Sequence, residues 1–96
     1  MKQMQALELL RKHKSILTKR FGVSRLALFG STARNTATSG SDLDVLVDFD
    51  GPATSDRYFG VQFYLEDLCH CPVDLVTGKA LRPELRPHIE NEAIVV

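Results

Sequence analysis

The stretch from Asp42 to Phe49 alternates apolar and polar side chains, a pattern typical of an extended strand with one buried face. Its apolar face would consist of Leu43, Val45, Val47 and Phe49. Its other face would consist of Asp42, Asp44, Leu46 and Asp48. Any fold for this chain must therefore bury one side of the strand against a core while it keeps carboxylates on the other side.

Helical and extended segments alternate along the rest of the chain. Helices are expected over residues 1–20, from Ser31, over 55–70 and around 83–92. Strands are expected over residues 25–29, 42–49, 72–77 and 93–96. Gly22 should end the first helix, Ser31 and Ser55 should stand near the starts of the second and third, and residues 38–41 should form a loop. This order predicts an α/β (α+β) fold in which helices cover one apolar face of a sheet.

Length and composition restrict the class of protein. The 96 residues suffice for a single domain over 1–96, and a hydrophobic content of 44% predicts a globular chain. Its core is expected to include Met4, Phe59, Phe63 and Leu68. No apolar run is long enough for a membrane span, and the charged start is unlike a signal peptide, so a cytoplasmic protein is expected. Cys69 and Cys71 should be free thiols, since no second ligand pair accompanies them for zinc.

Charge is distributed unevenly although its sum is zero. Residues 1–25 contain seven Lys or Arg against one acidic residue, and residues 42–74 contain eight Asp or Glu against one Arg. The zero net charge disfavours a dedicated nucleic-acid-binding surface. The basic run is interpreted as the solvated face of a helix, which would also suit an acidic partner.

Asp42 and Asp44 are the first feature with chemical meaning. Side chains two residues apart on a strand project to the same side about 6.6 Å apart, where these like charges would repel each other. A divalent cation removes that conflict, and a pair of Mg²⁺ ions is the usual device for phosphoryl or nucleotidyl transfer. Asp74 would add a third carboxylate if residues 72–77 lie beside residues 42–49. The solvated face of an edge strand is the alternative interpretation of an Asp-x-Asp pattern.

Gly30 and Ser31 follow a predicted strand and open a predicted helix. Gly30 permits a close backbone approach, and the Ser31 hydroxyl adds a hydrogen-bond donor, so this turn can receive a phosphate group. Arg34, one helical turn after Ser31, either reaches the phosphate or a partner or is an ordinary surface arginine. Ser41 either contacts the nucleotide or braces the loop before Asp42. The acids interpreted as merely solvated are Glu66, Asp67 and Glu92.

These residues together resemble the signature of the polymerase-β-like nucleotidyltransferases, in which Gly-Ser is followed after ten residues by Asp-x-Asp. The segments that carry the resemblance are GSTARNTATSGSDLDVLV, PVDLVT and IENEAIVV, so nearly the whole chain is similar to a minimal nucleotidyltransferase (MNT) domain. The resemblance implies a mixed sheet with flanking helices. It implies that Gly30 and Ser31 bind triphosphate. It also implies that Asp42 and Asp44 hold metal and that Asp74 is the third carboxylate.

The resemblance further implies an activity. Domains of this size commonly act as antitoxins beside a HEPN-domain toxin, a ribonuclease, and transfer AMP from ATP onto a tyrosine of that toxin. The expectation is a cytoplasmic adenylyltransferase of a type VII-like toxin–antitoxin system, with ATP as substrate, two Mg²⁺ ions and a HEPN partner. Transfer of nucleotides to RNA or to a small hydroxyl substrate, and neutralisation of the toxin by contact alone, are the alternatives. Asn35 stands where many relatives have Gly, and its tolerance of left-handed backbone should preserve the loop.

Overall fold

Helices and strands alternate in the predicted order within residues 1–38 and 40–96, the part of the chain that the computed structural model describes. The helices are α1 (Gln3–Phe21), α2 (Gly30–Ala33), α3 (Ser55–Cys69) and α4 (Arg86–Glu92), with a 3₁₀ turn η1 (Gly78–Ala80) before the last. The strands are β1 (Val23–Phe29), β2 (Leu43–Phe49), β3 (Val73–Thr77) and β4 (Ile94–Val95). The predicted loop over 38–41 includes residue 39, which lies outside the described residues.

The described strands form one mixed sheet in the order β3-β2-β1-β4. Strand β1 pairs antiparallel with both β2 and β4, whereas β2 and β3 are parallel. A parallel pair needs a long connection that returns to the same end of the sheet, and α3 supplies it between β2 and β3. The predicted adjacency of residues 72–77 and 42–49 is therefore confirmed.

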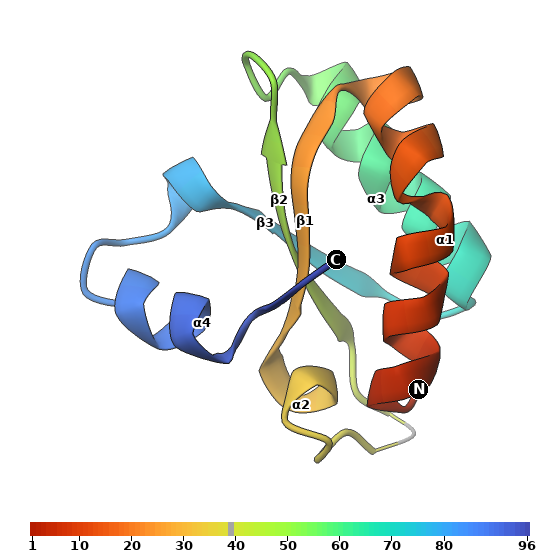
Figure 1. The fold of residues 1–96 in the computed structure, drawn as a ribbon, viewed down its shortest axis with the longest axis vertical. Helices are drawn as coiled ribbons and strands as arrows, with labels where there is room; N and C mark the ends of the chain where they lie inside the picture. The colour runs from red at the N-terminus through yellow and green to blue at the C-terminus, as the bar shows by residue number, and fades with distance from the viewer. Residues whose placement is uncertain (39) are drawn as a thin grey trace.

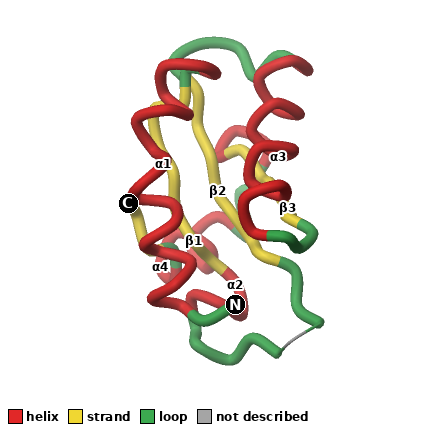
Figure 2. Tube along the Cα trace, turned by 90° about the vertical axis from the view of Figure 1, so that its right-hand side faces the viewer, coloured by secondary structure: helices red, strands yellow, loops and turns green. Residues whose placement is uncertain are grey.

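Helices α1 and α3 lie on the same side of the sheet, while α4 lies on the opposite side (Figure 1). The turned view shows α1 and α3 side by side in front of the strands with α4 behind them (Figure 2). We call the side covered by α1 and α3 the core face. The other side, which carries Asp44, Leu46 and Asp48 of β2, is the acidic face. The predicted fold class is confirmed, with α4 as the helix outside the main layer.

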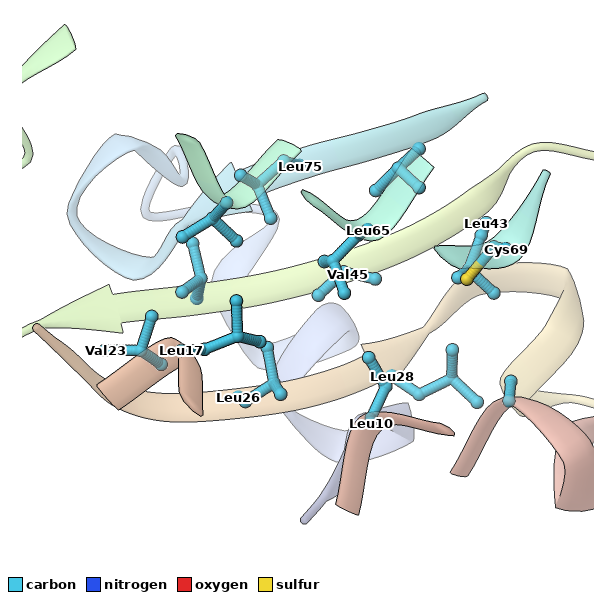
Figure 3. Close-up of a cluster of buried hydrophobic side chains, with 14 of the residues drawn as sticks. Leu10, Leu17, Val23, Leu26, Leu28, Leu43, Val45, Leu65, Cys69 and Leu75 are labelled. Carbon is cyan, nitrogen blue, oxygen red and sulfur yellow. The ribbon is translucent and has the colours of Figure 1, made fainter. Parts of the chain in front are cut away.

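The main core fills the space between the core face and the two long helices (Figure 3). Its fully buried side chains include Leu10, Leu17, Leu26, Leu28, Val45 and Leu65. Burying a side chain of this size is worth about 1.5–3 kcal/mol, so this layer supplies most of the driving force for folding. The predicted alternation of β2 holds, because Leu43, Val45 and Val47 enter this core while Leu46 joins a smaller cluster on the acidic face.

The ends of the helices agree with the sequence at some positions and differ at others. Gly22 closes α1 at φ +74°, and its N–H donates to the Thr18 carbonyl at 3.0 Å. Thr54, rather than the predicted Ser55, caps α3, since its hydroxyl accepts from the Arg57 N–H at 3.3 Å. Ser31 is not a cap either, because the helix α2 already begins at Gly30.

Three large side chains predicted for the core lie at the surface instead. Met4, Phe59 and Phe63 expose 64%, 48% and 59% of their area. On α3 the inward stripe consists of Val61, Leu65 and Cys69. Residues two positions away along a helix point about 200° away, so Phe59 and Phe63 must face outward, where their rings stack with centroids 6.0 Å apart. Apolar periodicity identified the helix correctly and selected the wrong stripe.

Most basic residues of α1 are solvated as predicted, but Lys14 is half-buried and its Nζ donates to the Val96 carbonyl at 2.6 Å. The side chains of Arg11, Lys12, Lys19 and Arg20 are exposed.

Cys69 and Cys71 are free thiols, and burial raises the pKa of Cys69 to about 11, with Cys71 adding to the shift. Such a thiol is a packing group rather than a nucleophile. Within the described residues, no helix combines the length and apolarity that crossing a bilayer requires.

Candidate active site

The carboxylates predicted for chemistry meet at one end of the sheet. In the register of the strands, Phe29 pairs with Asp44 and Asp44 pairs with Asp74. Gly30 follows Phe29 directly, and Asp42 lies just before the start of β2. Because Val73 and Leu75 enter the main core, the intervening Asp74 projects to the acidic face, as Asp44 does. The sheet thus brings together residues that are far apart in the chain.

The pKa of Asp44 is shifted by its position in this cluster. Burial raises its pKa to about 6, and the charge of Asp74, a hydrogen bond to the Asp74 side chain and the charge of Asp42 add to the shift. Arg34 acts in the opposite direction. The half-buried Asp44 and the exposed Asp74 repel each other when both are ionised, and a cation would relieve this repulsion.

Gly30 packs directly against Asp44. Its φ is +73°, in the left-handed region that favours glycine, and a Cβ atom at this position would overlap the Asp44 carboxylate. Glycine is therefore required here for two independent reasons, conformation and space. The next turn holds a second left-handed residue, Asn35 at φ +64°, so the predicted tolerance of that backbone is realised.

Glu92 belongs to this site, although the sequence indicated only a solvated acid. Its Oε1 accepts a hydrogen bond from the Gly30 N–H at 3.1 Å, and its Oε2 accepts from Nη1 of Arg34 at 2.8 Å. Burial would raise the pKa of Glu92, but the hydrogen bonds from Arg34 and Gly30 outweigh it and hold that pKa below its usual value. Glu92 is thus an anion at neutral pH. The prediction for Glu66 is wrong as well, since its carboxylate accepts from the Val73 N–H at 3.1 Å.

The side chains of Ser41 and Arg34 already have hydrogen-bond partners within the protein. The Ser41 Oγ accepts from the Thr38 N–H at 3.0 Å, which braces the loop before β2. Arg34 is paired with Glu92, and about half of its side chain is exposed. A surface hollow of about 300 Å³ is lined by Ser41, Thr32 and Cys71 among others, but not by Asp44 or Asp74. Asp42 and Asp74 are exposed, whereas Asp44 is half-buried.

The donor set at this end of the sheet fits Mg²⁺ in its chemistry. Mg²⁺ prefers oxygen ligands and is usually held by one or two carboxylates together with substrate phosphates. Asp44 and Asp74 supply such a pair, and the exposed Asp42 stands next to them. Within the described residues, no three acidic, His or Cys side chains already converge on one point as metal ligands. A third ligand would have to be recruited by rotation of the Asp42 side chain or provided by the substrate.

A comparison with protein families identifies the fold and the signature together. The model of the nucleotidyltransferase domain matches residues 10–96 of the chain. This protein belongs to the nucleotidyltransferase domain family. The resemblance inferred from the Gly-Ser and Asp-x-Asp signature is therefore confirmed, and the protein is an enzyme of the nucleotidyltransferase class.

Curated relatives of this nucleotidyltransferase match over almost their whole lengths. A Methanocaldococcus jannaschii protein named as a protein adenylyltransferase is 41% identical over 90 residues, which cover 93% of this chain and 92% of the relative. The protein adenylyltransferase MntA of Thermococcus cleftensis is 35% identical over 88 residues, covering 92% of this chain and 89% of the relative.

Solved structures agree with the family. A structure described as a minimal nucleotidyltransferase superposes with a TM-score of 0.82 at 36% identity, covering 98% of this chain and 95% of the other. A second structure holds a tri-AMPylated HEPN toxin of Shewanella oneidensis in complex with an MNT antitoxin. It matches with a TM-score of 0.60 at 17% identity, covering 97% of this chain and 66% of the other. At that identity the second likeness shows the shared fold alone.

Proposed function

We propose that this nucleotidyltransferase is a Mg²⁺-dependent protein adenylyltransferase that transfers AMP from ATP to a hydroxyl, that of a tyrosine, on a HEPN-domain toxin. In this proposal it acts in the cytoplasm as the antitoxin of the pair. The observation that carries the proposal is the placement of Asp44 beside Asp74 on adjacent strands, with Gly30 packed against Asp44, in a chain of this family. Relatives named as protein adenylyltransferases support the choice of reaction.

Asp42, Asp44 and Asp74 are the residues that would hold the metal. Two Mg²⁺ ions, when bound there, would neutralise the charge of the triphosphate and favour ionisation of the acceptor hydroxyl. Removal of metal should therefore abolish transfer. The proposal gives Asp74 a second task, which is to take or relay the proton of that hydroxyl.

The Gly-Ser segment and its neighbours would hold the nucleotide. Gly30 lets the backbone approach the triphosphate, and the Ser31 hydroxyl donates to it. Arg34 is close enough to influence Asp44 and would contribute positive charge beside the phosphates, while Ser41 holds the loop in shape. The acceptor oxygen attacks the α-phosphorus, the bond from that phosphorus to the bridging oxygen breaks, and pyrophosphate leaves with the electron pair. These side chains restrain the leaving group.

The acceptor would be delivered by another protein. Asp42 and Asp74 are exposed and Asp44 is half-buried, so a tyrosine presented by a partner can reach this cluster. The MNT antitoxin in complex with a tri-AMPylated HEPN toxin has the same fold, which supports a HEPN partner for this chain. A small-molecule acceptor would be better served by an enclosed pocket lined by Asp74.

The experiment compares wild type with Asp74→Ala in the presence of ATP labelled at the α-phosphate and a HEPN-domain protein as the acceptor. Wild type should label the partner and add the mass of one or more AMP groups to it. Asp74→Ala should add none. Asp67→Ala is the matched control, because Asp67 is an exposed acid on α3 and should leave labelling unchanged. If Asp74→Ala protects against the toxin as well as wild type does, and no mass is added by either, neutralisation occurs by contact and the proposal is wrong.

A further inference from the structure

Glu92 connects two residues, Gly30 and Arg34, that hold the nucleotide in the proposed function. One oxygen of its carboxylate accepts from the Gly30 N–H, and the other accepts from the Arg34 guanidinium. Gly30 itself lies against Asp44. A single carboxylate from the end of α4 therefore links the phosphate-binding turn to the arginine beside the acids.

The rest of α4 contacts the acidic face at several points, although none of its residues is fully buried. Ile89 and Ala93 pack against the cluster of buried side chains on the acidic face. The Arg86 guanidinium donates to the Gly78 carbonyl at 3.0 Å. Glu90 pairs with Arg25 at 3.2 Å. These contacts place the end of α4 beside Gly30 and Arg34, so the Glu92 carboxylate can orient both groups.

Both partners of Glu92, Gly30 and Arg34, would have more conformational freedom without it. Gly30 is the residue type with the greatest backbone freedom, and its peptide determines where the Ser31 hydroxyl points. Arg34 has 53% of its side chain exposed, so without a partner it would sample many rotamers. Because the Gly30 N–H is already donated to Glu92, the phosphate donors that remain in this turn belong to Ser31 and the residues after it.

We propose that Glu92 is a positioning residue for AMP transfer, which fixes the Gly30–Ser31 turn and orients Arg34 for the triphosphate. The inference rests on the proposed function, because it assigns a task within that reaction. Glu92 does not touch the reacting atoms. It acts through the donors that do, and misplacement of such groups by about 1 Å can lower a rate by about 10²-fold.

The test measures kcat and KM for ATP, in transfer to the HEPN partner, for wild type and the variants Glu92→Ala and Glu92→Gln. Glu92→Ala should lower kcat/KM by about 10²-fold, mainly through kcat. Glu92→Gln keeps an oxygen that can accept from the Gly30 N–H and loses the charge that holds Arg34, so it should recover about tenfold of that loss. The affinity for ATP with Mg²⁺, measured by calorimetry, should weaken in the same order.

The matched control is Glu90→Ala, on the same helix and equally part of an ion pair, but bound to Arg25 near the start of β1, whereas Gly30 and Asp44 lie at the other end of that strand. It should change kcat/KM by less than about twofold and shift the melting temperature as much as Glu92→Ala does. If the two variants differ only in melting temperature, Glu92 is a structural residue and the inference is wrong. If Glu92→Ala binds ATP more tightly than wild type, phosphate displaces Glu92 and the inference is also wrong. Failure of wild type itself to transfer AMP would instead contradict the proposed function.

Discussion

The two faces of the sheet are made from the same strands and yet do different work. The core face carries a continuous apolar layer that α1 and α3 cover (Figure 3). The acidic face has only a small apolar cluster, formed by Ala27, Phe29, Leu46 and Leu81. Around that cluster lie ion pairs, Arg25 with Asp48 and Arg34 with Glu92, and the facing acids Asp44 and Asp74. The core face stabilises the fold, whereas the acidic face contains carboxylates that repel one another.

The two-residue period of a strand makes this division possible. Along β2, residues 43, 45 and 47 stabilise the fold from the core face, while Asp44 between them points to the acidic face. Substitutions of neighbouring residues should therefore have effects of different kinds. Replacing the clustered acids of the acidic face should mainly change activity, and replacing the buried side chains of the core face should change stability.

The largest effect is expected from Asp42→Asn combined with Asp44→Asn. AMP transfer should fall by at least about 10³-fold, because the proposed metal ligands supply several kcal/mol to the transition state. The fold should be retained, since these side chains take no part in the main core. Rates of partner labelling and melting curves in metal-free buffer measure the two quantities. A marked drop of the melting temperature would show that these acids are structural and would erase the contrast between the faces.

A smaller effect, on stability alone, is expected from Leu65→Ala on α3. Leu65 is fully buried, so its truncation should lower the free energy of unfolding by about 2–5 kcal/mol. Phe63→Ala on the same helix is the control, since 59% of Phe63 is exposed and its removal should cost within about 0.5 kcal/mol. Urea denaturation measures both. Similar losses for the two variants would mean that the outer side of α3 is covered in solution.

The smallest effect concerns the pH dependence of Asp44→Asn in metal-free buffer. Burial, with the charge of Asp74 adding to it, raises the pKa of Asp44 from 3.8 to about 6, so the folded state keeps a proton that the unfolded state releases. This carboxyl therefore stabilises the fold fully below about pH 4 and loses that contribution as the pH rises through about 6. Above that pH the variant should exceed wild type by about 1–2 kcal/mol, after allowance for screening by solvent.

Urea denaturation between about pH 3, below the pKa of 3.8 for unfolded Asp44, and about pH 8 would reveal this difference. At the acidic end the free energies of unfolding of Asp44→Asn and wild type should agree, since Asp44 is then protonated in both folded and unfolded wild type. A difference that stays constant across the range would mean that Asp44 is not held at a raised pKa by its neighbours.

Local patterns predicted the elements well, and the reasons are physical. Alternation along β2 and the stop at Gly22 depend on neighbouring residues, so the chain records them directly. The adjacency of Asp44 and Asp74 was a conditional prediction that required two strands to pair. The family resemblance implied only a mixed sheet, and the parallel direction of this pair is known from the structure, because hydrophobic alternation is the same in parallel and antiparallel strands.

Other features depended on contacts that no local pattern encodes. Glu92 looks like any exposed acid near the end of a helix, and its partners Gly30 and Arg34 lie about sixty residues earlier in the chain. Phe59 and Phe63 follow helical spacing as well as Val61 and Leu65 do, so hydrophobicity alone could not rank the two sides of α3. Only the packed structure shows which stripe meets the sheet.

Strand β3, which carries Asp74, lies at the edge of the sheet. The proposed active site therefore depends on this edge strand staying paired. Edge strands have a neighbour on one side only, so they are the first to fray when a sheet opens locally. Fraying of β3 would carry Asp74 away from Asp44 while β1, β2 and β4 stay paired. If Asp74 holds metal as proposed, a copy damaged in this way would lose its activity while most of its fold persists.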